Sequence, residues 1–301
     1  MKKSNRYVLV LVALFALSSI ILTGCKAVSL TPPTFGGSHE TKKAKNKLKI
    51  GVSLSTLSNP FFISVRNGIN GVAKQNGTKT EVFDAQNDSS KQSSDIEDLI
   101  QKKVDVIIIN PVDSDAIVPA VKDANNAGIP VIACDRGSNG GKLLTTVASD
   151  NVKAGKMAAQ YMMSKVPNGG QVAELEGTPG ADAAIQRGKG FNDAAKGKLK
   201  IITKQSADFD RAKGLSVMEN ILQAHSSIQG VFAQNDEMAL GAVKAINNPN
   251  LVVVSIDGEP QGLTAVKQGK ISGIIAQSPE VEGQLAIKAA YRPYQGKSAV
   301  P

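Results

Sequence analysis

Short apolar segments alternate with longer helical patterns through most of this chain, and this alternation restricts the possible fold more than any other feature. The segment Val104-Asp105-Val106-Ile107-Ile108-Ile109 is an example, since β-branched residues run through it almost without interruption. Such runs between turn residues are typical of parallel strands buried on both faces. Ten strands are expected, near residues 49–54, 79–84, 104–110, 129–134, 144–148, 171–175, 199–205, 228–233, 251–256 and 271–276.

A helical pattern follows nearly every expected strand. These patterns lie near residues 61–76, 91–103, 114–127, 151–165, 181–196, 209–224, 236–247, 260–268 and 280–295. Strand followed by helix, repeated in this way, predicts the α/β class with doubly wound parallel sheets.

The chain of 301 residues is long for one hydrophobic core, and the strand-helix units fall into two similar halves. Two lobes joined by a hinge are therefore expected. The polar break 149–151 is the natural first crossing between them, and 276–279 is the second because Pro279 ends the strand and restarts a helix. The first lobe is predicted to comprise 49–149 plus 278–301, and the second lobe 150–277.

The N-terminus has the pattern of an export signal. Lys2, Lys3 and Arg6 precede the apolar run 7–21, which is too short for a comfortable transmembrane helix and ends in Leu22-Thr23-Gly24-Cys25. That ending resembles the lipobox of bacterial lipoproteins, which implies acylation of Cys25. We expect a signal peptide over 1–25, a flexible tether over 26–48 and a protein outside the cytoplasmic membrane.

The net charge of +9 is concentrated before the predicted fold. Residues 1–49 hold nine Lys and Arg against one acidic residue, which leaves 26 basic and 25 acidic residues in 50–301. A basic surface for a phosphate backbone is therefore absent from the folded part, so no nucleic-acid partner is expected.

Residue types for metal, disulfide or cofactor chemistry are scarce. Cys134 is the only cysteine besides Cys25, and His39 and His225 have no partner histidine or nucleophile nearby. The stretch Gly177-Thr178-Pro179-Gly180 lacks the lysine of a phosphate loop and is interpreted as a turn. We expect no cofactor, no metal and no catalytic residues.

The stretch Ser55-Thr56-Leu57-Ser58-Asn59-Pro60-Phe61-Phe62 joins the first strand to the first helix. Asn59 is a good N-cap, and Pro60 fits the first helical turn. Phe61 and Phe62 are two of only eight phenylalanines in a chain without tryptophan. Adjacent residues of one helix cannot both face inward, so the doublet predicts a ligand platform.

Polar side chains also follow the other strands, at the edge of the sheet where open α/β folds bind ligands. Each of these side chains is an amide, a carboxylate or a guanidinium, which forms hydrogen bonds in a fixed plane. Such groups match a small polyhydroxylated molecule. They are Asn59, Asn110, Asp135, Arg136, Asn235, Asp236, Asp257 and Gln277.

Longer stretches resemble the ribose class of periplasmic sugar-binding proteins over 49–300. They are the stretch 55–62 and Ile109-Asn110-Pro111-Val112-Asp113-Ser114-Asp115, Ala148-Ser149-Asp150-Asn151, Ala207-Asp208-Phe209-Asp210-Arg211 and Phe232-Ala233-Gln234-Asn235-Asp236-Glu237-Met238-Ala239-Leu240-Gly241. The resemblance implies sugar contacts from Asn59, Phe61, Phe62, Asn110, Asp135, Arg136, Arg187, Phe209, Asn235, Asp257 and Gln277. Arg187 and Phe209 enter this set through the resemblance alone.

The resemblance also implies a function. A monomeric binding protein, held at the membrane by its lipid, would capture D-ribose between the lobes, close about a hinge and deliver the sugar to an ABC transporter permease. The resemblance further implies that family members continue for about a dozen residues beyond the position of Pro301. Those residues make a third crossing between the lobes and a final strand on the second lobe.

Three alternatives differ from this interpretation. A binder of another small sugar, such as allose, galactose or a furanosyl signalling molecule, would keep the fold. A regulator of the lactose-repressor type would need a helix-turn-helix where this chain has its export signal. A sugar-modifying enzyme could use Asp135 and Asp257 as acid and base, but no cofactor loop or metal ligands accompany them.

Overall fold

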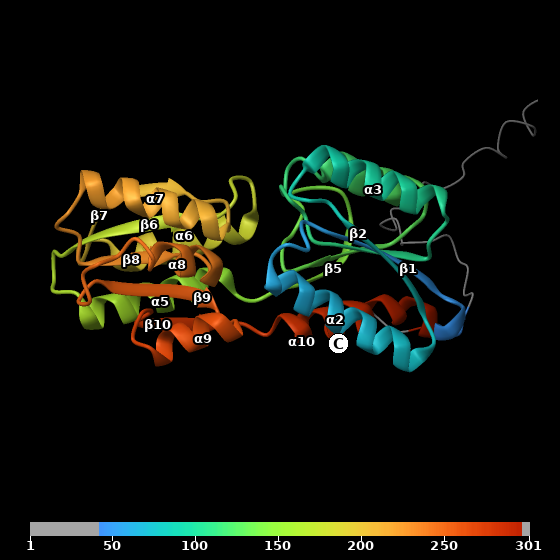
Figure 1. Ribbon diagram of the computed structural model, residues 1–301. Coiled ribbons are helices and arrows are strands. Elements are labelled where there is room, and N and C mark those ends of the chain that lie inside the picture. The colour runs from blue at the N-terminus through green and yellow to red at the C-terminus, as the bar shows by residue number, and fades with distance from the viewer. Residues whose placement is uncertain (1–41, 297–301) are drawn as a thin grey trace, which may run out of the picture. The chain divides into compact units, whose positions relative to one another are not determined.

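The computed structural model describes residues 42–296, so the predicted signal peptide, Cys25 and the predicted segment beyond Pro301 lie outside the described residues. The first of two five-stranded sheets has the order β2-β1-β3-β4-β5, and its neighbouring strands all pair in parallel. Its strands are β1 (Lys49–Leu54), β2 (Lys79–Asp84), β3 (Val106–Ile109), β4 (Val131–Cys134) and β5 (Leu143–Val147). Figure 1 shows its strands β1, β2 and β5 between helices α3 (Ser89–Gln101) and α2 (Pro60–Asn76).

The second sheet has the order β10-β9-β8-β6-β7 and is also parallel. Its strands are β6 (Gln171–Glu176), β7 (Lys200–Ser206), β8 (Gly230–Ala233), β9 (Val252–Asp257) and β10 (Gly273–Ala276). All ten predicted strands are present with bounds within two residues of the prediction, and the predicted α/β class with two parallel sheets is confirmed.

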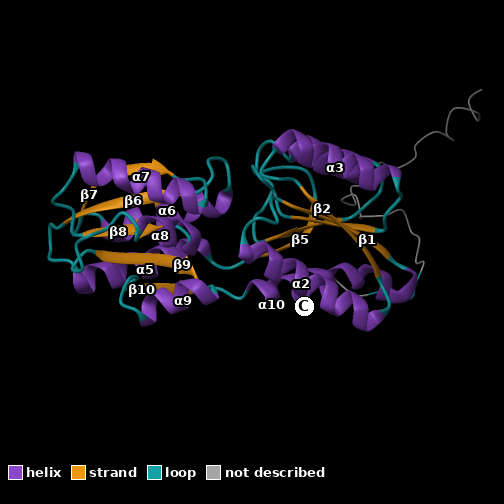
Figure 2. Ribbon diagram, viewed as in Figure 1, coloured by secondary structure: helices purple, strands orange, loops and turns teal. Residues whose placement is uncertain are grey.

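Helices cover both faces of the first sheet (Figure 2). Helices α2 (Pro60–Asn76) and α10 (Pro279–Tyr291) share a core with Ile108 of β3. Helices α3 (Ser89–Gln101) and α4 (Val118–Asn126) share the opposite core with Ile107 and Ile109. Successive residues of a strand point to opposite faces, so the uninterrupted apolar run of β3 supplies both cores.

The second sheet is covered in the same way. Helices α5 (Asn151–Lys165) and α6 (Asp182–Ala195) share a core with Phe232 of β8, whose ring stacks on that of Phe191 at 4.4 Å between centroids. Val231, on the other face of β8, lies in the core with α7 (Arg211–Ala224), α8 (Asp236–Ala242) and α9 (Pro260–Lys267). Each half is thus a three-layer sandwich.

The chain passes from one sheet to the other twice. It leaves β5 and enters α5, which packs against α6 and the second sheet. It leaves β10 and enters α10, which packs against α2 and the first sheet before the short 3-10 helix η2 (Pro293–Gln295). The segments 148–150 and 277–278 join strand and helix at these two points.

Folded residues are already present before residue 49, within the segment 26–48 that was predicted to be a flexible tether. The 3-10 helix η1 (Lys45–Lys47) precedes Leu48, which is 1% exposed within the first core. Lys43 Nζ also lies 2.6 Å from Asp105 Oδ1. Residues 43–48 are therefore attached to the first lobe, because apolar burial and an ion pair offset the entropy of ordering them.

Three helices are shorter than predicted, and one of them is α10, which ends at Tyr291 and not near residue 295. Helix α4 starts at Val118 and not near residue 114, because Asp113 Oδ1 accepts hydrogen bonds from the N–H groups of Asp115 and Ala116, both at 2.8 Å, and forms a turn instead. Helix α8 ends at Ala242 and not near residue 247. Across residues 42–296, no helix has both the length and the apolar character needed to cross a membrane.

Candidate functional site

The aromatic doublet lies where β1 gives way to α2. Asn59 caps the helix, since its Oδ1 accepts from Phe61 N at 2.8 Å. The rings of Phe61 and Phe62 stand edge to face, with 5.3 Å between centroids, and the two residues are 4% and 3% exposed. Both rings are buried here, although the helix periodicity predicts that only one faces inward, because both line a pocket that other side chains cover.

Asn110 and Asp135 connect the ends of β3 and β4. Asn110 Nδ2 donates to Asp135 Oδ2 at 3.1 Å and to the carbonyl of Cys134 at 3.0 Å. Asn110 Oδ1 accepts from Ser55 N at 3.2 Å, which ties β1 to the same point. Asp135 has φ of 66° and a second oxygen, Oδ1, that is buried without a hydrogen-bond partner. A left-handed conformation at a non-glycine residue is strained, and here it holds a carboxylate at the pocket.

Arg136 lies between two aromatic rings. Its Cζ is 5.1 Å from the ring centroids of Phe62 and Phe209, and its Nη1 donates to the carbonyl of Pro111 at 3.2 Å. Its Nε lies 3.6 Å from Asp135 Oδ2. Burial raises the pKa of Asp135 above its ordinary value of 3.8, although Arg136, Arg187 and the Asn110 hydrogen bond all lower it.

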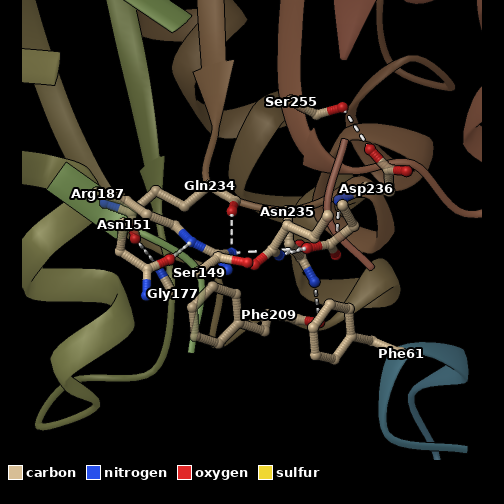
Figure 3. Close-up of polar contacts among 12 residues, drawn as sticks. Phe61, Ser149, Asn151, Gly177, Arg187, Phe209, Gln234, Asn235, Asp236 and Ser255 are labelled. Atoms are coloured by element: carbon tan, nitrogen blue, oxygen red, sulfur yellow. Dashed lines mark hydrogen bonds and ion pairs between the residues drawn. The ribbon is translucent and has the colours of Figure 1, made fainter. Parts of the chain in front are cut away.

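Arg187 projects from α6 and is held on two sides. Its Nε donates to Asn151 Oδ1 at 2.8 Å, and its Nη1 donates to the carbonyl of Gln234 at 2.7 Å (Figure 3). Nη1 also lies 3.7 Å from Asp257 Oδ1. The guanidinium, 5.7 Å from the Phe209 ring centroid, thus has a fixed plane inside the pocket.

The segment after β7 places Phe209 by a strained turn. Asp208 and Phe209 have φ of 52° and 58°, and Asn235 Nδ2 donates to the Phe209 carbonyl at 3.3 Å. A methyl group on Gly177 would lie 2.0 Å from Cζ of Phe209, so only glycine leaves space for this ring. The predicted turn 177–180 therefore also shapes the pocket. Asn235 Oδ1 caps α8 through Met238 N at 2.9 Å.

Asp257 and Gln277 lie at the ends of β9 and β10. Gln277 Nε2 donates to Asp257 Oδ1 at 2.7 Å, and the other oxygen of Asp257 accepts from Asp236 N at 3.4 Å. Burial raises the pKa of Asp257 well above its ordinary value, and the nearby Asp236 raises it further, while Arg187 lowers it. Gln277 Oε1 is buried without a hydrogen-bond partner.

These side chains converge on one cavity of about 20 Å³. Its walls include Ala183 and nine of the eleven residues predicted to bind ligand: Asn59, Phe61, Phe62, Asp135, Arg136, Arg187, Phe209, Asn235 and Asp257. Asn110 and Gln277 are not in the wall, but each bonds to one of the two carboxylates. Asp236 lies behind Asp257, and the Oδ1 of Asp236 accepts from Ser255 Oγ.

Sequence reasoning missed the residues that support this wall from behind. Asn151 was expected only as part of a crossing and of a matching stretch, and Gln234 only as part of a matching stretch. Glu174 was not singled out, although it is fully buried and accepts from Gln234 Nε2 at 2.9 Å. A buried polar residue within a strand is a signal that could have indicated Glu174.

Neither a metal site nor a reactive thiol is evident in the described part of the chain. No group of three or more His, Cys, Asp or Glu among residues 42–296 could hold a metal ion. Cys134 is buried, and burial raises the pKa of its thiol well above the ordinary value, which disfavours the reactive thiolate.

The fold and the pocket are those of a two-lobed solute-binding protein. The model of the periplasmic binding protein domain family matches residues 50–298, and the chain belongs to that family. The chain is 51% identical over 286 residues to the ribose import binding protein RbsB of Bacillus subtilis, which covers 94% of this chain and 92% of the relative. It is 44% identical over 258 residues to RbsB of Salmonella typhimurium, covering 84% and 87%.

Solved structures give the same picture. A Caulobacter myo-inositol binding protein bound to myo-inositol has a TM-score of 0.79 and 32% identity, covering 82% of this chain and 88% of that one. An ABC transporter periplasmic solute binding protein from Actinobacillus succinogenes with bound D-allose has a TM-score of 0.76 and 35% identity, covering 85% and 94%.

Proposed function

We propose that this protein captures D-ribose in the cavity between its two halves and delivers it to the permease of an ABC transporter. One observation carries the proposal: nine residues expected to bind sugar, drawn from both halves, line a single cavity. The 51% identity to a ribose import binding protein supports ribose as the particular sugar.

Unsatisfied polar atoms at the pocket indicate how a sugar is held. Asp135 Oδ1, Arg136 Nε and Gln277 Oε1 are buried without hydrogen-bond partners. Adjacent hydroxyl groups of a sugar both donate and accept, so they can pair with carboxylates and guanidinium groups at once. In the proposed complex Asp135 and Asp257 accept from hydroxyls, the two arginines donate, and the phenylalanine rings cover the C–H faces.

The wall residues are too deeply buried for a sugar to enter this arrangement of the two halves. Asp135, Arg136 and Asp257 are each 4% exposed and Arg187 is 3% exposed, so the halves must move apart to admit a ligand. We propose that the lobes, 49–149 plus 278–301 and 150–277, hinge about 149–151 and 277–279. A sugar that makes its full set of hydrogen bonds only when both lobes surround it favours the closed state.

We also propose that the protein works on the outer side of the cytoplasmic membrane. Its relatives include a D-allose-binding periplasmic protein of Escherichia coli, 32% identical over 253 residues, covering 79% of this chain and 81% of the relative. Anchoring through Cys25 rests on the sequence pattern alone, because that residue lies outside the described part. A monomer is proposed because the lobes of one chain supply every wall residue.

Another sugar is the alternative, since relatives are named for D-allose and for galactofuranose. Isothermal titration calorimetry of the soluble protein with D-ribose, D-allose and D-galactose separates the two. We expect the tightest binding for D-ribose, because a buried group left unpaired by a poorer match costs roughly 1 to 3 kcal/mol. Tighter binding of another sugar would overturn ribose as the ligand, and turnover of the sugar would overturn the binding role.

A further inference from the structure

Two hydrogen bonds fix the guanidinium of Arg187, and one of them comes from a side chain outside the cavity wall. Asn151 Oδ1 accepts from Nε at 2.8 Å, and the Gln234 carbonyl accepts from Nη1 at 2.7 Å (Figure 3). Asn151 and Arg187 are 2% and 3% exposed. A long arginine side chain loses much rotamer freedom when it binds a ligand, so fixing it beforehand improves affinity.

Asn151 is not needed to cap its own helix. It is the first residue of α5, and the cap is Asp150, whose side chain accepts from Lys153 N at 2.9 Å. The side chain of Asn151 is instead directed to Arg187. One turn along α5, a methyl group on Gly155 would lie 2.0 Å from the Arg187 carbonyl oxygen. The start of α5 therefore contacts both the backbone and the side chain of Arg187.

The same crossing segment is attached to the first half of the molecule. Ser149 Oγ donates to Glu282 Oε1 at 2.6 Å, and Glu282 belongs to α10. The three residues 149–151 thus bond to α10 at one end and to a cavity side chain at the other. A movement of this segment would therefore shift the guanidinium of Arg187 through its hydrogen bond to Asn151.

We infer that Asn151 is a positioning residue, which orients the guanidinium of Arg187 for the ligand and connects the crossing segment to the pocket. The inference rests on the proposed function for the identity of the ligand, but the contact itself can be tested without one. Asn151 is not in the wall of the ligand cavity, and its side chain accepts from Arg187, so its effect on the ligand passes through Arg187.

The first test compares three variants by calorimetry with D-ribose. Asn151→Ala removes the acceptor and should weaken binding about tenfold or more, because hydrogen bonds to charged groups are the strong ones. Asn151→Asp keeps an acceptor oxygen and should stay within about threefold of the native affinity. The control Asn70→Ala also loses one side-chain hydrogen bond, from Thr80 at 3.0 Å in the first half, and should bind ribose normally.

The second test distinguishes positioning from a structural effect on α5. In an Arg187→Met background, Asn151→Ala should change the sugar affinity by less than about twofold, because two residues that act through one contact are not additive. Binding in that background is followed by NMR up to high millimolar sugar. An undiminished loss would show that Asn151 acts on α5 and would overturn the inference.

A third measurement needs no sugar. The Nε–H signal of Arg187, assigned by its disappearance in Arg187→Met, should be protected from hydrogen exchange in the native protein and exposed in Asn151→Ala. Unchanged protection contradicts positioning even if the Arg187→Met variants bind too weakly to measure. If the native protein binds no sugar while this protection depends on Asn151, the proposed function fails and the positioning role stands.

Discussion

The carboxyl groups of Asp135 and Asp257 are each only 4% exposed, so their negative charges are poorly solvated in the folded protein. Burial raises the pKa of both groups, and the neighbouring arginines only partly compensate. An acid whose pKa is higher in the folded state than in the unfolded chain binds more protons when folded. Its folded state therefore loses stability as the pH rises from about 4 toward the raised pKa. Binding and stability have opposite requirements at these residues.

Asp257→Asn should separate those requirements. The amide cannot ionise, so the ligand-free variant should melt a few degrees above the native protein at pH 8, with the difference vanishing near pH 4. Ribose affinity should fall by about 2 kcal/mol or more, because the amide lacks the negative charge beside Arg187 and replaces one of the two acceptor oxygens with a donor. Melting curves across pH and calorimetry measure the two effects.

Gln268→Asn, on the surface segment after α9, is the control and should alter neither quantity. The quantity to compare is the melting temperature of Asp257→Asn minus that of the native protein. If this difference were smaller at pH 8 than at pH 4, it would contradict the assigned direction of the pKa shift of Asp257. Unchanged ribose affinity would remove Asp257 from the site.

Strand ends were the part of the site that the sequence could predict. Once the parallel sheets are inferred, Asn110 must lie at the carboxyl edge of the first sheet and Asp257 at the carboxyl edge of the second. Arg187 lies within a helix and Phe209 in a strained turn, and no periodicity places either at the pocket, so only resemblance indicated them. Asn151 was missed because its partner is a protein side chain, and long-range contacts leave no local sequence pattern.

At the scale of elements, glycine residues bring two pairs of helices into close contact. In the α5–α6 pair, a methyl group on Gly190 would lie 2.0 Å from the Val152 carbonyl oxygen. In the α2–α10 pair, a methyl group on Gly68 or Gly283 would lie 2.1 Å from a backbone oxygen of the partner helix. Helix α10, which follows the second crossing, packs directly on α2, the helix that carries Phe61 and Phe62. Helix α5, which follows the first crossing, packs directly on α6, the helix that carries Arg187.

Gly68→Ala should therefore destabilise the protein, because α2 and α10 must separate to avoid Glu280 O. Overpacking of this kind costs about 1 to 3 kcal/mol, or several degrees of melting temperature. Gly71→Ala, one turn further along α2, meets no atom within 4 Å and should instead stabilise the helix slightly. Thermal unfolding measures the melting temperatures of Gly68→Ala and Gly71→Ala, and equal values would contradict close packing at Gly68.

Element boundaries were predictable to within two residues for strands because turn residues end each apolar run. The helix ends were less predictable. The start of α4 depends on Asp113, whose side chain competes with the helix for backbone N–H groups. Helix propensity alone gave no indication of that competition.

At the scale of the molecule, the repeat of strand-helix units predicted two sheets, but not what joins them besides the crossings. The structure has a second set of contacts, at positions outside the cavity wall. Gly137 N donates to Asp182 Oδ2 at 2.9 Å, and Ser114 N donates to the Gly180 carbonyl at 3.0 Å. Asp182 N donates to Ser114 Oγ at 3.2 Å. These bonds connect loops of the first half to the start of α6, which carries Arg187.

Such bonds should favour the arrangement in which both halves contribute to the pocket. The apparent affinity of a ligand falls in proportion to the population of the binding-competent state, so a residue that never touches sugar can change it. Asp182→Ala removes the acceptor for Gly137 N and should weaken ribose binding by about three- to tenfold, mostly through faster dissociation. Asp182→Asn retains an acceptor oxygen and should bind nearly as the native protein does. Stopped-flow dissociation rates and calorimetry measure this, with melting of the ligand-free variants as the check on folding. A native dissociation rate in Asp182→Ala would show that the contacts between Gly137 and Asp182 contribute nothing to holding the sugar.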